Sequence, residues 1–237
     1  MSSAIEKRVA RQDWQRIGDE LDRFGHAGTG RLLGERECRD LIRLYDDDAR
    51  FRSTVVMERH AYGLGEYRYF GYPLPPLVAA LRRALYAPLA EVAQRWAEQL
   101  ATGEGYPPRL EDFLETCRAA GQGKATPLLL RYREGGYNCL HQDRYGEVAF
   151  PLQAAILLSR PGRDFTGGEL LLVEQRPRAQ SRGEAVALEQ GHAILFANAV
   201  RPAAGKRGFH RVTLRHGVSR LRSGERLTLG IIFHDAR

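Results

Sequence analysis

The chain has 237 residues, of which 43% are hydrophobic and 27% charged, as in a soluble globular protein that can bury a full core. No apolar run approaches the roughly 20 residues of a membrane span, no signal-peptide core is present, and the three cysteines are scattered, so a cytoplasmic protein without a membrane segment is expected. The net charge of +7 permits, without requiring, attraction to nucleic acid or to acidic small molecules.

Helices are predicted to dominate the first 125 residues. Apolar side chains recur in steps of three to five residues over 4–24, which predicts one amphipathic helix that ends before Gly25. A strand is predicted over 51–59, where β-branched and apolar residues concentrate. The other helices of this part are predicted over 34–46, 77–101 and 109–120.

Glycines punctuate an aromatic stretch over 63–73, which predicts an irregular loop with Tyr67 near its middle. Such a loop could line the mouth of a pocket. Its tyrosines could equally pack a helix against a sheet. Both interpretations stay open, and Tyr67 is retained as a candidate residue of a substrate rim.

After Gly121 the character of the sequence changes from helix to strand. Short runs rich in Leu, Ile, Val and Phe are separated by Gly, Pro, Asp and Ser, a pattern typical of an antiparallel jelly roll. The predicted fold is therefore α+β, with a mainly helical part over 1–125 packed on one sheet of a jelly roll over 126–237, in one compact unit. The strands are predicted over 127–133, 149–159, 168–174, 185–189, 192–198, 211–221 and 226–234.

Three residues carry the pattern of a metal site. His141 and Asp143 lie two positions apart on an extended segment, so their side chains project to the same side. His216 supplies a second imidazole far downstream. Two His and one carboxylate that leave other coordination positions open form the facial triad of non-haem Fe(II) oxygenases. A surface turn is the alternative for an isolated His-x-Asp tripeptide.

The distal histidine has a rival, because both His210 and His216 are followed by an arginine ten residues later. Arg220 comes just before a turn-like Ser-Gly-Glu stretch, whereas Arg226 begins a strand of alternating character. Period two places Arg226 and Thr228 on the same face, where they can hold one carboxylate together. His216 is therefore favoured over His210.

Five elements that occur in order carry a family resemblance over 128–237, nearly half of the chain. With them the sequence resembles the 2-oxoglutarate-dependent Fe(II) dioxygenases, particularly the prolyl-hydroxylase-like branch. More loosely, it is similar to uncharacterised bacterial oxygenases sometimes labelled as acting on damaged DNA. The resemblance implies the double-stranded β-helix form of the jelly roll. The elements are Tyr132 with a glycine pair, His141-x-Asp143, Gly167-Gly168-Glu169, His216-x-Val218 and Gly224-x-Arg226.

The resemblance also implies cofactors and a reaction. Fe(II) would be bound by the two histidines and the aspartate, with 2-oxoglutarate as co-substrate and O2 as oxidant. Arg226 and Thr228 would hold the far carboxylate of 2-oxoglutarate, and Tyr132 would donate a hydrogen bond to it. The implied reaction is hydroxylation of a substrate C–H bond with release of succinate and carbon dioxide.

The sequence constrains the substrate least. An amino-acid, peptidyl or small acidic substrate is placed ahead of an alkylated DNA or RNA base, because base-repair dioxygenases carry a second arginine where this chain has Ile232. Nucleic acid is favoured by the basic charge and by three arginines that follow the Gly-Gly-Glu strand and could hold phosphates at a pocket rim. These arginines are Arg176, Arg178 and Arg182.

Two interpretations without oxygenase activity also remain. A cupin-like metal-binding protein would use more histidine ligands and would give Arg226 no special role. A nucleic-acid-binding module without catalysis would bind with steep salt dependence, and its binding would survive the loss of His141.

Overall fold

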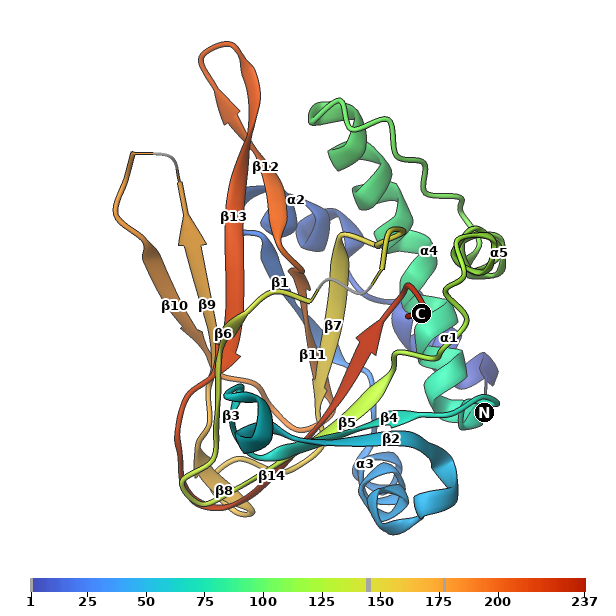
Figure 1. Ribbon diagram of the computed structural model, residues 1–237, viewed down its shortest axis with the longest axis vertical. Helices are drawn as coiled ribbons and strands as arrows, with labels where there is room; N and C mark the ends of the chain where they lie inside the picture. Colours follow the sequence, from blue (N-terminus) through green and yellow to red (C-terminus); the bar gives the residue numbers. More distant parts are fainter. Residues whose placement is uncertain (1, 144–145, 177) are drawn as a thin grey trace.

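Two antiparallel sheets form the frame of the molecule, and the computed structural model describes residues 2–143, 146–176 and 178–237. Helices pack on the outer face of the larger sheet, and the smaller sheet lies against its other face (Figure 1). This arrangement confirms the predicted α+β jelly roll with helices on one sheet. Among the described residues, no helix is long and apolar enough to cross a membrane. The α-helices are α1 (Ser2–Ala10), α2 (Trp14–Phe24), α3 (Glu35–Arg43), α4 (Pro76–Gln99) and α5 (Leu110–Ala119).

The larger sheet has eight strands and the smaller has six. Across the larger sheet the order is β1 (His26–Arg31), β11 (His192–Ala197), β7 (Leu152–Leu157), β14 (Leu221–Ile232), β5 (Leu128–Arg133), β4 (Glu66–Phe70) and β2 (Phe51–Val56), and β8 (Phe165–Gly167) pairs with β14. Across the smaller sheet it is β10 (Arg182–Val186), β9 (Leu170–Gln175), β13 (Gly208–Val218), β6 (Tyr137–His141) and β3 (Gly63–Leu64), and β12 (Val200–Gly205) pairs with β13.

Strands from the first 125 residues extend the larger sheet at both edges. β1 pairs with β11 at one edge, and β4 and β2 continue the sheet beyond β5 at the other. The sequence does not predict β1, because its two glycines give weak strand propensity and its conformation depends on pairing with β11. We propose on this basis that 1–125 and 126–237 form one compact unit.

The prediction of a single helix over 4–24 is wrong. The chain breaks between α1 and α2, because the Asp13 side chain caps α2 by accepting a hydrogen bond from the backbone N–H of Arg16 at 3.0 Å. The indole N–H of Trp14 donates to the carbonyl of Val9 at 2.9 Å and closes the turn. The apolar spacing continues across the break because both helices pack on the same core.

The prediction of an aromatic loop over 63–73 is also wrong for most of its length. The segment forms β3 and β4, and β4 lies between β2 and β5. Tyr67 and Tyr69 share one face of β4 and line the cavity between the sheets. Gly63 and Gly65 have positive φ angles and interrupt the alternating pattern, so the strand is hard to see in the sequence.

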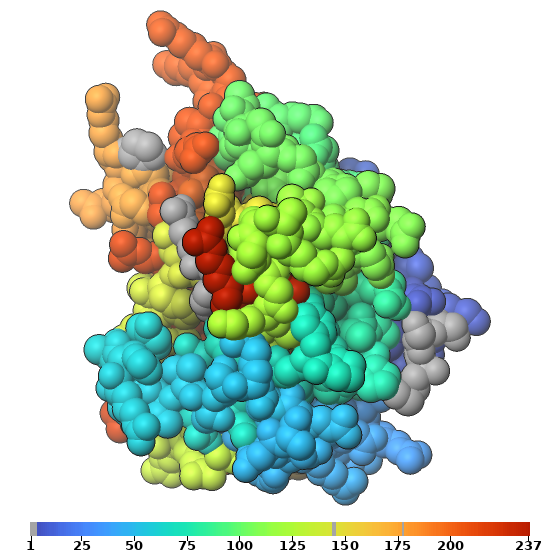
Figure 2. Space-filling model, turned by 45° about the vertical axis from the view of Figure 1, so that its right-hand side comes forward, coloured from blue at the N-terminus to red at the C-terminus, as the bar shows by residue number. Residues whose placement is uncertain are grey.

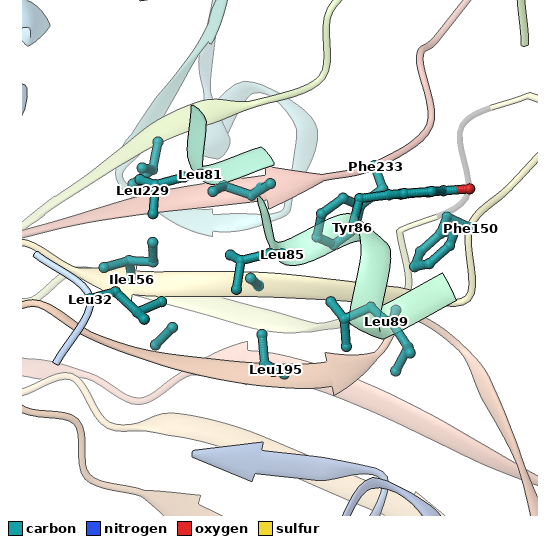
Figure 3. Close-up of a cluster of buried hydrophobic side chains, with 14 of the residues drawn as sticks. Leu32, Leu81, Leu85, Tyr86, Leu89, Phe150, Ile156, Leu195, Leu229 and Phe233 are labelled. Carbon is teal, nitrogen blue, oxygen red and sulfur yellow. The ribbon is translucent and has the colours of Figure 1, made fainter. Parts of the chain in front are cut away.

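The alternation of β14 separates the hydrophobic core from the cavity. Leu229 faces α4 and joins a buried cluster with Leu85 and Tyr86 (Figure 3). Burying one leucine of this kind stabilises a fold by roughly 1.5–3 kcal/mol. Arg226 and Thr228 lie on the opposite face of β14 and line the cavity, as the period-two pattern predicts.

Two hairpins project from the same end of the molecule. One is formed by β9 and β10 and the other by β12 and β13, and the β12–β13 hairpin extends beyond the upper end of α4 (Figures 1 and 2). The sequence does not predict β12, because Pro202 and small residues give it little strand propensity.

His234, which follows β14, should make the fold sensitive to acid. It is fully buried, its Nδ1 accepts the backbone N–H of Phe150 at 3.1 Å, and burial, assisted by the charge of Arg82, lowers its pKa to about 4. In the unfolded chain a histidine has a pKa of about 6.5, so between these values only the unfolded state takes up the proton. The free energy of unfolding should therefore fall by up to about 3 kcal/mol as the pH drops from 6.5 towards 4.

Urea denaturation at pH 7.0 and pH 4.5 measures this loss. His234→Asn keeps a polar side chain without the titration, so its unfolding free energy should change less between the two pH values. An equal change in both proteins would show that His234 is not the group responsible.

Candidate active site

The two sheets enclose a cavity of about 460 Å³. Side chains of β5, β7 and β14 line it from the larger sheet, and side chains of β6 and β13 line it from the smaller one. The cavity is within the size range of small-molecule sites. Its polar groups gather in two places, a cluster of two imidazoles with a carboxylate and a buried guanidinium.

The cluster consists of His141, Asp143 and His216. His141 ends β6 directly opposite His216 on β13, so strand pairing brings two residues distant in sequence into register. The carboxylate lies between the rings, with Asp143 Oδ2 at 3.2 Å from His216 Nε2 and Oδ1 at 3.6 Å from His141 Nε2. One ligand atom from each residue lies within 4.8 Å of the other two.

These three residues fit a metal ion. Two ligand atoms each about 2.1 Å from a metal, at right angles, are about 3 Å apart, close to the separations found here. Burial, and next the charge of His216, lower the pKa of His141, which favours the neutral imidazole that a metal requires. His141 Nδ1 lies 2.8 Å from the carbonyl oxygen of Cys139, and a proton donated there leaves Nε2 free for a metal.

Two glutamines hold the cluster in place. Gln142 donates to the backbone carbonyls of Ala199 at 3.1 Å and Leu214 at 2.8 Å, which fixes the chain between the two ligands on β6 and its extension. Gln153 of β7 donates to Asp143 Oδ2 at 2.9 Å, and its Nε2 lies 3.3 Å from His216 Nε2. Contacts of this kind orient metal ligands and tune their basicity.

Arg226 is the second polar feature of the cavity. Its side chain is only 3% exposed, and its Nη1 donates to Thr228 Oγ1 at 2.7 Å. Across 2–143, 146–176 and 178–237, no carboxylate forms an ion pair with it, and its guanidinium lies instead over the rings of Tyr132 and Phe165 at 5.8 and 6.0 Å. Burial lowers the pKa of Arg226, yet an arginine stays protonated in a protein. A buried cation without an acidic partner is a site for a carboxylate ligand.

Neighbouring residues hold Arg226 in this position. Tyr132 lies opposite Arg226 across β5 and β14, and burial raises the pKa of Tyr132 to about 12, so its hydroxyl keeps its proton. Asn138 donates to that hydroxyl at 3.3 Å. Gly168 makes room for the arginine, because a Cβ there would lie 3.0 Å from Arg226 Cδ and closer still to Leu221.

Comparison with known proteins identifies the family. Residues 65–236 match the Oxygenase-NA family, described as oxygenases catalysing oxidative methylation of damaged DNA. The chain belongs to the Oxygenase-NA family. An uncharacterised protein of Mycobacterium tuberculosis is 50% identical over 167 residues, which cover 70% of this chain and 72% of that protein.

Solved structures agree on the fold of this chain. A prolyl-4-hydroxylase of Pseudomonas putida superposes with a TM-score of 0.53 at 15% identity, covering 94% of this chain and 99% of the other. A 2OG-Fe(II) oxygenase family protein of Burkholderia pseudomallei has a TM-score of 0.54 at 15% identity, covering 95% and 93%. The protein is thus an oxygenase by family, with the fold of the 2-oxoglutarate- and Fe(II)-dependent enzymes and a His-Asp-His cluster suited to their metal.

The predicted rim residues lie in different places. Tyr67 lines the cavity, whereas none of the three rim arginines does. Arg176 and Arg182 sit on the β9–β10 hairpin beside the buried Glu174, at 2.7 and 4.0 Å from its oxygens. The last of the three is Arg178, which is exposed at the tip of the hairpin. His210, the rival ligand, is exposed on β13 away from the cluster.

Four residues of the site are not evident from the sequence. Tyr62 and Tyr69 line the cavity beside Tyr67; the sequence prediction placed Tyr69 in a loop and gave Tyr62 no role. Gln153 does leave a signal, since it is the single polar residue in the apolar run 152–158 and falls on the cavity face of β7. Gln142, between two ligands, gives no signal of its backbone partners on distant strands.

Proposed function

We propose that the protein is an Fe(II)- and 2-oxoglutarate-dependent dioxygenase that hydroxylates a substrate C–H bond with release of succinate and carbon dioxide. The observation that carries the proposal is the pairing, in one cavity, of a two-His-one-carboxylate cluster with a buried arginine that lacks an acidic partner. A cupin-like metal protein gives that arginine no task, so the oxygenase is preferred.

Each residue has a distinct task in this proposal. His141, Asp143 and His216 would hold Fe(II) and leave about three positions of an octahedral ion open. Arg226 and Thr228 would bind the far carboxylate of 2-oxoglutarate, and the protonated Tyr132 hydroxyl would donate a hydrogen bond to it. With iron bound, the centre supplies the oxidation that divides O2 between succinate and the substrate hydroxyl. The apolar walls of the cavity keep water away from the reacting groups.

The substrate that we favour is an alkylated base in nucleic acid. Arg226 is the one lysine or arginine among the described residues that line the cavity, so a small acidic substrate would find no second cation there. Tyr62 and Tyr67 instead present flat rings on which a planar base can stack, and Leu140 adds apolar surface. Hydroxylation of a carbon bonded to a ring nitrogen gives a product that releases the carbon as an aldehyde and restores the base. The family description, which names damaged DNA, supports the same choice.

Hydroxylation of an amino-acid or peptidyl side chain is the second candidate. It is favoured by the ten-residue interval from His216 to Arg226 with Thr228 beside it, which resembles the amino-acid hydroxylases. For either substrate we propose a cytoplasmic protein, because Cys38, Cys117 and Cys139 are separate free thiols.

A succinate-release screen distinguishes the substrates. The protein with Fe(II), 2-oxoglutarate and O2 is offered N-methylated oligonucleotides, peptides and free amino acids, with Asp143→Ala as the inactive control. We expect methylated oligonucleotides to raise succinate release well above the substrate-free rate and to yield an equal amount of formaldehyde. Stimulation by peptides or amino acids alone would reverse the order of the candidates, and no 2-oxoglutarate turnover with any substrate would refute the dioxygenase proposal.

A further inference from the structure

We propose that the β12–β13 hairpin and the outer face of β13 form a binding surface for single-stranded nucleic acid that leads to the cavity. The inference rests on the proposed function for the identity of the substrate, but it concerns a surface outside the cavity and is tested by binding alone. It is carried by charge, by the facing of the strand residues and by one exposed aromatic side chain.

The charged residues of this region, apart from histidine, are all basic. The stretch 190–224 contains six arginines and one lysine and no aspartate or glutamate. Across 2–143, 146–176 and 178–237, no carboxylate forms an ion pair with Lys206, Arg207 or Arg211. The neighbouring β9–β10 hairpin differs, because the Glu174 carboxylate forms ion pairs with Arg176 at 2.7 Å and with the buried Arg201 at 2.5 Å. Cations that form no ion pair with a described carboxylate are therefore concentrated on the β12–β13 hairpin rather than on the β9–β10 hairpin.

Strand alternation places Arg211 and Arg215 in a row on one face of β13. Phe209, Arg211 and Arg215 lie on one face of β13 and are exposed, while His216 lies on the opposite face and enters the cavity. The row from Phe209 to Arg215 is about 20 Å long at the rise of an antiparallel strand. Cations spaced along such a row match the spaced phosphates of an extended strand.

Phe209 adds a feature that phosphate binding alone does not explain. It is 48% exposed at the end of the hairpin, directly after Gly208, whose positive φ makes the turn. The hairpin stands clear of the body of the molecule, so a base can reach the ring (Figure 2). An exposed ring between cations is the arrangement on which unpaired bases stack, and duplex bases are not available for it.

The row ends beside the cavity. Arg215 precedes His216, which pairs with His141 of the adjacent strand β6. Leu140, the neighbour of His141, is 41% exposed and also lines the cavity. A strand held along the outer face of β13 therefore lies on the far side of the smaller sheet from His216, and it reaches the mouth of the cavity by crossing the adjacent strand β6 at Leu140.

Fluorescence anisotropy with a labelled 20-nucleotide oligothymidylate tests the surface. We expect Lys206→Ala/Arg207→Ala/Arg211→Ala to weaken binding at least about tenfold at 0.1 M salt and to make the slope of log affinity against log salt shallower by about two. The matched control is Arg36→Ala/Arg39→Ala/Arg43→Ala, which removes equal charge from exposed positions of α3 at the opposite end of the molecule (Figure 1). Its binding should stay within about twofold of the unaltered protein.

Two further measurements separate base stacking and co-substrate binding from this surface. Phe209→Ala should weaken binding about tenfold without changing the salt slope. Arg226→Leu should bind the oligonucleotide normally even when it no longer binds 2-oxoglutarate, so the surface and the dioxygenase proposal can fail independently. Equal losses in the hairpin and α3 variants, tighter binding of a duplex, or equal competition by polyglutamate would overturn the inference.

Discussion

Replacing His216 by alanine should abolish 2-oxoglutarate turnover while leaving the fold intact. His216 supplies one of three ligand atoms that lie within 4.8 Å of one another, and its ring sits in a cavity rather than in the hydrophobic core. Loss of a residue that merely orients a ligand costs about 10–100-fold in metal affinity, so loss of a ligand should cost more. His141→Ala and Asp143→Ala should behave alike, with Fe(II) binding measured anaerobically by calorimetry and turnover by succinate release.

His210→Ala is the matched control for this experiment. It removes an imidazole from the same strand, β13, at an exposed position outside the cluster. Its Fe(II) affinity and its turnover of 2-oxoglutarate should equal those of the unaltered protein. An inactive His210→Ala together with an active His216→Ala would contradict the ligand assignment.

Arg226→Leu should lower the affinity for 2-oxoglutarate at least about tenfold, because a charge-assisted contact contributes about 1.5–3 kcal/mol. The guanidinium is buried and donates to Thr228 at 2.7 Å. No other lysine or arginine among the described residues lines the cavity, so none can replace it. Anaerobic titration calorimetry with the iron-loaded protein measures the effect, and Fe(II) should remain bound.

Tyr132→Phe calibrates the Arg226 result. It removes one neutral donor from the same corner of the cavity, so its loss of affinity should be smaller. If Arg226→Leu bound 2-oxoglutarate as tightly as the unaltered protein, the arginine would have to be removed from the co-substrate site.

Local patterns in the sequence predict part of this molecule well. β14 alternates over its whole second half, so the facing of Arg226 and Thr228 into the cavity follows from period two alone. The facing of Leu229 towards α4 follows in the same way. The jelly roll itself is predictable because its short apolar strands are separated by clear turn residues.

Features that depend on distant partners are not predictable in this way. β4 adopts its conformation between β2 and β5, and glycines hide its alternation. The contact of Gln153 with Asp143 joins strands whose register no local pattern specifies. Arg176 illustrates the same limit for charge, because its Glu174 neighbour is engaged by Arg201, 27 residues away in sequence.

The buried charge of Arg226 is needed to bind the co-substrate but lowers the stability of the protein. A buried cation that forms no ion pair with a described carboxylate lowers the stability of the protein whenever 2-oxoglutarate is absent, and a leucine in its place avoids that cost. Selection for heat resistance alone would therefore favour loss of the very residue that binds the co-substrate. The same charge makes 2-oxoglutarate a stabiliser of the native state, so the lifetime of the protein in a cell would follow the supply of a central metabolite.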